Sequence, residues 1–335
     1  MSPAKKSPTI YDVAERSGVS ITTISRVINS PEKVNPDTRV RVLDVIDKLA
    51  FTPKAEARAR ALQQTGRIGV ITPFFTAPSF VQRLRGIAGA ISKVDYELVI
   101  YTVDSQEHLR SHLASLSLTG NIDGLIVISL PIRGQQAKQL TQRQIPTVLI
   151  EYPNPAFNGV EIDDVAGGRM AAEHLIRKGH TRLAYLGDTN PPDYAIHPAS
   201  LRRRGFRQVV QEAGLSMPAQ YVRSAPNMPE PTRELATELL TMKRPPSAIF
   251  AASDFQALIL LKTARQLGVC VPEDVAIVGF DDLDMAEYED LTTISQHLDE
   301  SGRLAIEILL AHIREEALPP QHVTIPLTLV ERLTT

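Results

Sequence analysis

Hydrophobic and polar positions divide the chain of 335 residues into a short helical segment and a long segment of alternating elements. Up to about residue 53, apolar residues recur three or four positions apart, which is the spacing of amphipathic helices. From Gly66 onward, continuous apolar runs of strand length alternate with helical patterns. Strands of this kind, separated by helices, predict parallel sheets that are covered by helices on both faces.

The long segment contains two such sets of elements. The first set predicts strands at 67–73, 96–103, 124–129, 147–152 and 159–163, with helices near 80–94, 106–119 and 134–143. The second set predicts strands at 182–188, 221–225, 248–253 and 275–282, with helices near 165–178, 199–214, 230–243 and 254–267. A last helix near 299–316 and the strand-like run VTIPLTLVERL must return to pack on these sets. The sequence therefore predicts an α/β core of two doubly wound lobes joined by three crossovers.

The helical segment begins with two short helices separated by a tight turn, over residues 9–29 (TIYDVAERSGVSITTISRVIN). Thr9 and Asp12 fit a capping box at the start of the first helix. Gly18 stands where that helix must end in the left-handed conformation, and Ser20 caps the second helix. This pattern predicts a helix-turn-helix.

The second helix, 21–28, has few apolar residues for a helix buried in a core. It carries short hydrogen-bonding side chains and one arginine instead: Thr22, Thr23, Ser25, Arg26 and Asn29. Such side chains are suited to base edges and phosphates. The alternative is an ordinary helical pair in a globular core, which the charged N-terminal segment disfavours.

A third helix is predicted from Asn35, which precedes a proline and an acidic first turn. Apolar residues at helical spacing predict a three-helix core formed by Val40, Leu43, Ile46, Leu49 or Ala50 with Val13, Ala14, Val19, Ile24 and Val27. Residues 54–62 (KAEARARAL) follow, with high helix propensity but too short a length to hold a helix alone in water.

Residues 9–63 resemble the headpiece of the LacI/GalR family of bacterial transcription regulators. The family pattern of Thr, aliphatic, Tyr, Asp-Val-Ala, Gly-Val-Ser and Thr-aliphatic-Ser-Arg-Val-aliphatic-Asn is matched almost throughout. The resemblance covers the rest of the chain too, where the two lobes are similar to those of periplasmic sugar-binding proteins. It implies a DNA-binding headpiece at 1–53, a hinge helix and linker at 54–65, and an effector-binding and dimerisation core at 66–335. The N-lobe is expected at about 66–163 and 293–322, and the C-lobe at about 164–292 and 323–335.

The resemblance assigns DNA contacts to the headpiece. Base readout falls to Ile21, Thr22 and Arg26, because an arginine fork can donate to guanine O6 and N7 in the major groove. Phosphate contacts are expected at Thr9, Tyr11, Ser20, Thr23, Ser25, Asn29, Asn35 and Thr38. The implied partner is double-stranded operator DNA.

The hinge departs from the family pattern. In the family this segment orders on the operator and places a leucine pair in the minor groove, as a wedge. Here Arg60 takes the wedge position, Leu62 lies two residues later, and Ala57 is the other residue assigned to the groove. Either Leu62 still wedges, or Arg60 recognises a narrow A·T-rich groove by its charge. The second alternative is favoured.

Effector contacts are expected directly after the predicted strands, since ligands of open α/β sheets bind beyond the carboxyl ends of strands. The candidates are Phe75, Phe80, Glu151, Asp163, Ser253 and Asp281. Carboxylates accept hydrogen bonds from sugar hydroxyls and aromatic rings pack on C–H faces, so a sugar-like effector is predicted.

The resemblance adds residue roles to this site. Asp281, in GFDD, matches the family's effector-contacting strand end, and Arg202, in SLRRRGF, stands at its effector arginine. Ser253 replaces the asparagine that is common in the family, which puts an amide contact in doubt. Asp164 and Asp254 directly precede predicted helices, so a helix N-cap is the alternative role for them.

Charge is distributed unevenly along the chain. Residues 1–62 contain 11 Lys and Arg against 7 Asp and Glu, whereas the remaining residues contain 25 against 31. A basic N-terminal module followed by an acidic remainder is expected if only the module meets a polyanion. The absence of an 18-residue apolar run or an apolar leader predicts a cytoplasmic protein without a membrane partner. The single cysteine, Cys270, excludes an internal disulfide and is expected to be buried or half-buried.

Two other classes of protein also contain doubly wound lobes. An enzyme would need a motif such as G-x-G-x-x-G after the first strand, a P-loop or a nucleophile elbow, and none is present. The eight histidines show no metal spacing, so neither metal nor cofactor is assigned. A periplasmic-type binding protein without a DNA role would need an export signal and would have no use for the headpiece. The prediction is a transcription regulator, expected to be a repressor, that acts as a homodimer on a pseudo-palindromic operator.

Overall fold

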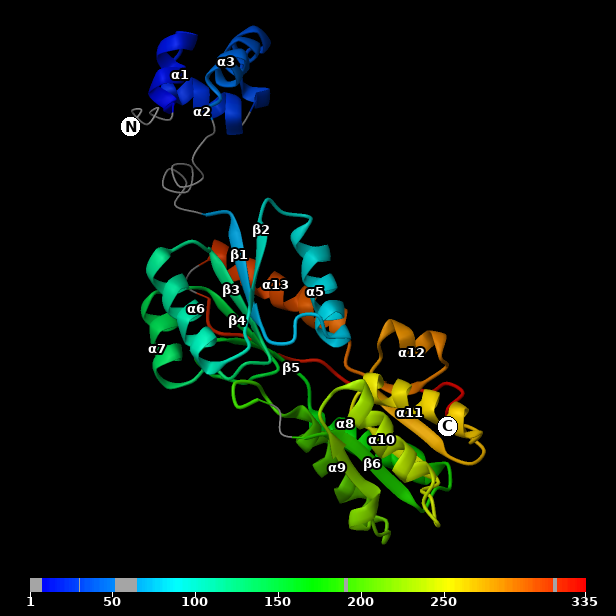
Figure 1. Ribbon diagram of the computed structural model, residues 1–335. Helices are drawn as coiled ribbons and strands as arrows, with labels where there is room; N and C mark the ends of the chain where they lie inside the picture. The colour runs from blue at the N-terminus through cyan, green and yellow to red at the C-terminus, as the bar shows by residue number, and fades with distance from the viewer. Residues whose placement is uncertain (1–7, 30, 52–64, 190–191, 316–317) are drawn as a thin grey trace, which may run out of the picture. The chain divides into compact units, whose positions relative to one another are not determined.

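The computed structural model describes residues 8–29, 31–51, 65–189, 192–315 and 318–335. The chain divides into two compact units, Met1–Thr65 and Gly66–Thr335 (Figure 1). Each unit has hydrophobic clusters of its own. The first unit is the headpiece, and the second is the two-lobed core.

The headpiece is helical, as predicted. Its elements are α1 (Ile10–Ser17), α2 (Ile21–Asn29), the 3₁₀ turn η1 (Pro31–Lys33) and α3 (Pro36–Leu49). The Asp12 carboxylate accepts the Thr9 backbone N–H at 2.6 Å, and Gly18 ends α1 with a φ of 66°. The Ser20 hydroxyl accepts the Thr23 backbone N–H at 3.2 Å at the start of α2. These caps confirm the predicted helix-turn-helix.

Three residues predicted to be buried or half-buried are exposed. Val40 is 64% exposed and Leu43 is 48% exposed, whereas Val42 is fully buried. Two apolar stripes overlap on α3, and packing against the other helices selects the stripe that contains Val42. The headpiece core consists of Val13, Ile24, Val27, Val42 and Phe51. Cys270 is exposed, because its loop turns at the surface, where its backbone N–H donates to Asp274 at 2.8 Å.

The N-lobe contains a parallel six-stranded sheet in the order β11, β5, β4, β3, β1, β2. Its strands are β1 (Arg67–Thr72), β2 (Glu97–Thr102), β3 (Gly124–Ile128), β4 (Thr147–Ile150), β5 (Asn158–Glu161) and β11 (His322–Thr324). Its helices are α5 (Pro78–Ile91), α6 (Gln106–Thr119), α7 (Gly134–Gln142) and α13 (Leu298–Arg314). α5 and α13 cover one face of the sheet, and α6 and α7 cover the other (Figure 1).

The C-lobe repeats this plan with the order β12, β10, β9, β8, β6, β7, in which only β12 is antiparallel to its neighbour. Its strands are β6 (Leu183–Asp188), β7 (Val222–Ala225), β8 (Ala248–Ala251), β9 (Ala276–Asp281), β10 (Thr292–Ser295) and β12 (Thr328–Val330). Its helices are α8 (Asp164–Arg177), α9 (Pro198–Glu212), α10 (Pro229–Leu240), α11 (Asp254–Leu267), α12 (Asp284–Tyr288) and the 3₁₀ turn η2 (Ala219–Tyr221).

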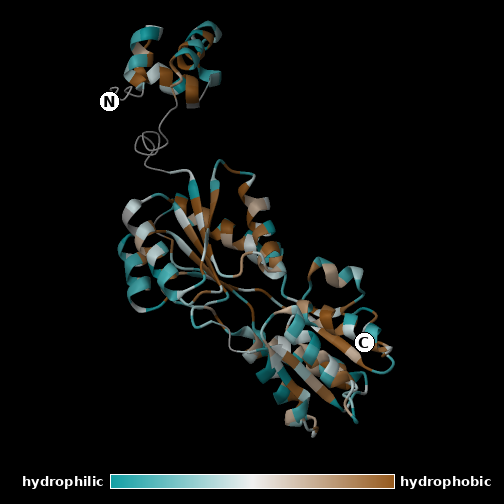
Figure 2. Ribbon diagram, in the orientation of Figure 1, coloured by the Kyte–Doolittle hydropathy of each residue, from teal (hydrophilic) through white to brown (hydrophobic). Residues whose placement is uncertain are grey.

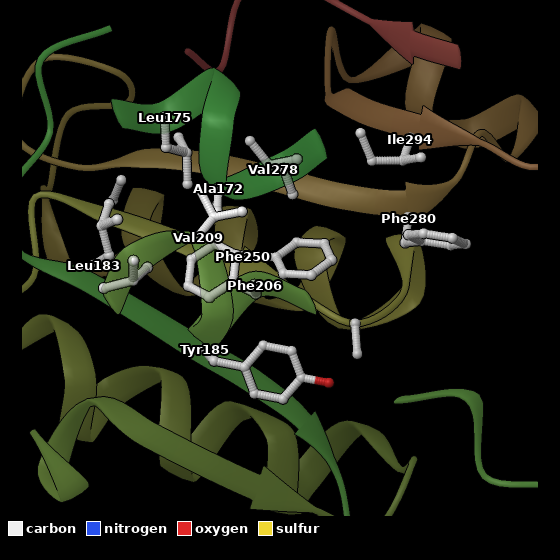
Figure 3. Close-up of a cluster of buried hydrophobic side chains, with 14 of the residues drawn as sticks. Ala172, Leu175, Leu183, Tyr185, Phe206, Val209, Phe250, Val278, Phe280 and Ile294 are labelled. Carbon is white, nitrogen blue, oxygen red and sulfur yellow. The ribbon is translucent and has the colours of Figure 1, made fainter. Parts of the chain in front are cut away.

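Hydrophobic residues concentrate along the strands of both sheets (Figure 2). In the C-lobe, α8 and α9 pack on one face of the sheet around a cluster that includes the aromatic side chains of Tyr185, Phe206, Phe250 and Phe280 (Figure 3). The rings of Phe206 and Phe250 lie 5.2 Å apart, and Tyr185 lies 5.7 Å from Phe250. The Tyr185 hydroxyl, which is buried, donates to the Ala199 carbonyl at 2.6 Å. α10 and α11 cover the opposite face.

The chain passes between the lobes three times, after β5, after β10 and after β11. The second and third crossings lie a few residues beyond the boundaries expected at 293 and 323. Thr293–Ser295 still pair with β9 in the C-lobe, and Thr324 still pairs with Glu161 in the N-lobe. The strand-like run at the C-terminus is therefore two strands, one in each sheet.

Glycine allows one pair of helices in each lobe to approach closely. A Cβ at Gly302 in α13 would lie 2.1 Å from the carbonyl oxygen of Arg83 in α5. A Cβ at Gly168 in α8 would lie 1.9 Å from the carbonyl oxygen of Arg202 in α9. Both distances are far below van der Waals contact, so these positions need a residue without a Cβ. The side chains of Arg83 and Arg202 are buried beside these crossings.

Candidate DNA-binding surface and effector site

Helix α2 exposes the side chains predicted to contact bases. Ile21 is 38% exposed, and Thr22 and Arg26 are exposed too. Ile24 and Val27 are buried in the headpiece core, which fixes the opposite side of the helix. An exposed polar face on the second helix of a helix-turn-helix is the arrangement that enters the major groove.

Six of the eight residues predicted to hold phosphates lie just before or in the first turn of a headpiece helix, whereas Ser25 lies in the middle of α2 and Asn29 at its end. Thr9, Ser20 and Asn35 are exposed capping positions, and the Asn35 side chain accepts the Asp37 backbone N–H at 2.9 Å. Tyr11 is 70% exposed. Thr23, Ser25 and Thr38 are half-buried, and Asn29 is the last residue of α2. Helix N-termini favour anions, so the placement suits phosphate contacts, which stay predictions.

The hinge residues assigned to the minor groove, Ala57, Arg60 and Leu62, lie outside the described residues.

In the C-lobe, Arg202 and Asp281 lie together, and not on opposite sides of the site as the sequence led us to expect. The Arg202 guanidinium stacks on the Phe280 ring, 3.6 Å from its centroid. Its Nε donates to Asp164 Oδ1 at 2.8 Å, and its Nη1 donates to the Ala252 carbonyl at 2.6 Å. Asp281 Oδ1 lies 3.7 Å from Nη1. Both arginine and aspartate are about 5% exposed.

Burial changes the proton affinity of these acids. Burial raises the pKa of Asp281 to about 8, because Arg202 only partly offsets the loss of water and the nearby Asp254 adds repulsion. Burial raises the pKa of Asp164 as well, against the influence of Arg202. Asp281 and Asp282 have φ angles of 123° and 59°. Residues other than glycine rarely adopt this backbone conformation, because it is sterically unfavourable for them. The end of β9 is therefore a strained, buried polar site.

In the N-lobe, Glu151 follows β4 and is bound by two donors. Arg83 Nη2 donates to Glu151 Oε1 at 2.6 Å, and the Ser129 hydroxyl donates to Oε2. Burial alone would raise the pKa of Glu151, but Arg83, the Ser129 hydrogen bond and Arg202 lower it below its usual value. Glu151 is therefore an ionised hydrogen-bond acceptor.

One side chain joins these two polar clusters. Gln296 lies in the crossover between β10 and α13, where its Oε1 accepts from Arg83 Nη2 at 3.3 Å. Its Nε2 donates to Asp281 Oδ1 at 2.5 Å. A chain of polar contacts thus runs from Ser129 in the N-lobe to Asp164 in the C-lobe.

Sequence reasoning missed Arg83 and Gln296. A signal for Arg83 was present, since it shares a helical stripe with Phe80, Leu84 and Ile87, where a cation is unexpected. An arginine within an apolar stripe predicts a buried partner of opposite charge. Gln296 offers no comparable pattern.

The aromatic candidates lie between β1 and the first turn of α5. Phe75 is 40% exposed, and Phe80 is half-buried. Phe74 contacts Phe80 edge-on with ring centroids 6.0 Å apart, and Tyr194 lies 6.4 Å from Phe74. Phe74 and Tyr194, which were not predicted, therefore form an aromatic cluster with Phe80.

Asp163 and Ser253 are helix caps. Asp163 Oδ1 accepts the Ala166 N–H at 2.9 Å at the start of α8. Ser253 Oγ accepts the Gln256 N–H at 3.3 Å at the start of α11. Their contacts with an effector stay predictions. Both side chains already accept a hydrogen bond from a backbone N–H group.

The alternative cap roles of Asp164 and Asp254 are wrong by one residue, because each is the first residue of its helix. Asp164 pairs with Arg202 instead. Asp254 is fully buried and accepts the Leu283 N–H at 2.8 Å and the Thr293 hydroxyl at 2.5 Å. Asp254 therefore ties α11 to the segments on either side of α12.

Comparison with known families identifies the class of protein. A model described as "Bacterial regulatory proteins, lacI family" matches residues 9–54. A "Periplasmic binding protein-like domain" matches residues 172–335. Together with the helix-turn-helix and the two-lobed core, these matches define a DNA-binding transcription regulator.

Individual relatives span nearly the whole chain. The ribose operon repressor of Escherichia coli strain K12 is 31% identical over 332 residues, covering 97% of this chain and 98% of the relative. The chain belongs to the LacI family of bacterial transcription regulators.

Solved structures agree. A complex of the transcriptional regulator CelR with cellobiose is 28% identical with a TM-score of 0.70, covering 98% of this chain and 100% of the other. The Lac repressor dimer bound to operator and the anti-inducer ONPF is 25% identical with a TM-score of 0.79, covering 98% and 99%. These relatives are named as transcription regulators. None of the described helices is long and apolar enough to cross a membrane.

Proposed function

We propose that this protein is a cytoplasmic repressor that binds a pseudo-palindromic operator as a homodimer and is controlled by a sugar or sugar derivative bound between its lobes. The observation that carries the proposal is the polar chain from Glu151 to Arg202, which lies at the carboxyl ends of strands from both lobes. Relatives named for a ribose operon and solved with cellobiose support a sugar. The headpiece disfavours the alternative, a binding protein without a DNA role.

In this proposal each part of the site has a role. Asp281 and Glu151 accept hydrogen bonds from effector hydroxyls, and Arg202 donates. Phe75 and Phe80 pack on C–H faces, and Asp163 and Ser253 add polar contacts. The effector favours one orientation of the lobes, and operator affinity changes by the coupling free energy, which is ~1–3 kcal/mol in typical cases.

The core carries the proposed dimer contact. Val81 on α5 and Met285 and Tyr288 on α12 are 51%, 52% and 77% exposed. Arg85 joins the two helices through an ion pair with Asp284 at 2.6 Å, so these apolar side chains belong to adjoining elements. Sedimentation of the chain from Gly66 onward, which forms a unit with its own hydrophobic core, should give a dimer. A monomer at micromolar concentration would refute this arrangement.

DNA recognition is tested at Arg26. Arg26→Ala should cost ~1–3 kcal/mol of operator binding and relax the preference at one base pair per half-site. Selection from random DNA with the full-length protein measures both effects. Lys48→Ala removes the same charge from α3 and should leave the selected sequence unchanged. If Arg26→Ala selects the same consensus and binds it with the affinity of the wild type, Arg26 does not contact a base.

Two hinge models remain to be separated. If Arg60 enters the minor groove, Arg60→Leu should change the preference for an A·T-rich operator centre and reduce the salt dependence by roughly one phosphate-equivalent per subunit. If Leu62 wedges, Leu62→Ala should abolish DNA bending instead. Gel-shift bending assays with both variants distinguish the two models.

A further inference from the structure

Arg83 is a buried cation shared by the two halves of the proposed effector site. Its side chain is 2% exposed, although it lies on a helix with an exposed opposite face. Its Nε donates to Ser301 Oγ on α13 at 2.9 Å, and its Nη2 donates to both Glu151 and Gln296. These three acceptors belong to three separate segments, so the guanidinium fixes them relative to one another.

The position of Arg83 is itself fixed. Its carbonyl oxygen lies against Gly302 at the crossing of α5 and α13. The Ser301 hydroxyl, which accepts from Arg83, donates to the Leu298 carbonyl at 2.7 Å. Backbone and side chain of Arg83 are therefore both anchored, and a planar guanidinium so held has little freedom to turn toward a ligand.

We propose that Arg83 is a positioning residue of the effector site, which orients Glu151 and, through Gln296, Asp281 to accept hydroxyl groups of an uncharged polyhydroxylated ligand. This inference rests on the proposed function and adds that the ligand carries no charge. Arg83 acts through Glu151 and Gln296 and need not touch the ligand.

The charges of the site argue for an uncharged ligand. Glu151 faces the cations Arg83 and Arg202 and the acids Asp164 and Asp281. Both guanidinium groups already donate to protein acceptors. A phosphate or carboxylate on the ligand would approach three acids, and Arg202, which is proposed to donate to the ligand, is already paired with Asp164 and Asp281. Hydroxyl groups can donate to the same acids.

Calorimetry on the full-length protein tests the inference. The probes are ribose, cellobiose and glucose as uncharged sugars, with ribose 5-phosphate and gluconate as charged ones, between pH 6 and 8.5. The variants are Arg83→Met, Arg83→Met/Glu151→Gln and, as a matched control, Arg110→Met, which removes an exposed arginine of the same lobe.

We expect the wild type and Arg110→Met to bind an uncharged sugar in preference to the charged probes. Arg83→Met should bind at least tenfold more weakly. Its affinity should increase as pH rises, because the pKa of Glu151 rises without Arg83 and the carboxylate accepts hydroxyl groups best when it is ionised. The double variant, without an unpaired buried charge, should regain the melting temperature of the wild type but not its affinity.

Several outcomes would overturn the inference. Unchanged affinity in Arg83→Met, or full recovery of affinity in the double variant, would reduce Arg83 to a structural role. Tighter binding of a charged probe by the wild type would overturn the ligand class. If the wild type binds no sugar, the proposed effector is wrong, and Arg83 is judged by melting alone. A pH profile of melting in Arg83→Met that matches the wild type would then contradict its control of Glu151.

Discussion

Each lobe has a buried arginine at a close helix crossing, but the two arginines contact different parts of the core. In each lobe the carbonyl oxygen of a buried arginine lies against a glycine of the neighbouring helix, Arg83 against Gly302 and Arg202 against Gly168. Each guanidinium pairs with a buried acid at the carboxyl end of the sheet, Glu151 in the N-lobe and Asp164 in the C-lobe. The same helix packing thus places a cation in each half of the proposed effector site.

The partners differ, and the difference bears on how the site responds to a ligand. Arg202 contacts Asp164, Ala252 and Phe280, all in the C-lobe, so its half is complete by itself. Arg83 donates to Gln296 in a crossover, and Gln296 donates to an acid of the C-lobe. A change in lobe orientation therefore strains the contacts of Arg83 first, while those of Arg202 persist.

The largest effect should follow from Arg202→Met. It leaves Asp164 and Asp281 buried without their cation, and breaking a buried pair in this way costs about 3–5 kcal/mol of unfolding free energy. Urea unfolding of the full chain measures the loss, with Arg203→Met, an exposed neighbour, as a control expected to be near neutral. A smaller loss from Arg202→Met than from Arg83→Met would reverse the assignment of the self-contained half.

Replacing the crossing glycines should have the next largest effect. Gly302→Ala and Gly168→Ala each force a Cβ against a carbonyl oxygen, and overpacking of this kind costs about 1–3 kcal/mol. Gly89→Ala on α5 is the matched control, since a Cβ there meets no atom within 4 Å. Thermal unfolding should show two destabilised variants and an unchanged or stabilised control. Stability equal to the wild type at either crossing would mean that the helices can separate without loss.

The sequence predicted the lobes well, because apolar runs and helical stripes report burial directly. It predicted the C-lobe half of the site through a motif, with Arg202 in SLRRRGF and Asp281 in GFDD. Arg83 and Gln296 escaped, because their role depends on which segments meet in space, some 213 residues apart. Val40 and Leu43 failed for a related reason, since spacing alone does not choose between two overlapping stripes on one helix.

Asp281 should make the stability of the protein depend on pH. Its pKa is about 8 in the folded protein, above its usual value, so the folded state binds more protons than the unfolded state between about pH 4 and pH 8. The contribution of Asp281 to the free energy of unfolding must then fall as pH rises through this range. Asp281→Asn, which mimics the protonated group, should flatten the decline above pH 6. A residual slope below that pH is expected from Asp254, whose pKa burial raises to about 6. Identical slopes in wild type and variant would contradict the shift.

The central claim, that the buried polar site between the lobes controls DNA binding, is tested most directly by operator affinity with and without effector in Asp281→Ala. Fluorescence anisotropy on an operator obtained by selection from random DNA measures it, with the wild type alongside and the effector drawn from the sugars that the wild type binds. The account predicts that Asp281→Ala keeps wild-type operator affinity without effector and loses the change in affinity that the effector causes. An unchanged effector response in Asp281→Ala would place the controlling site elsewhere in the protein.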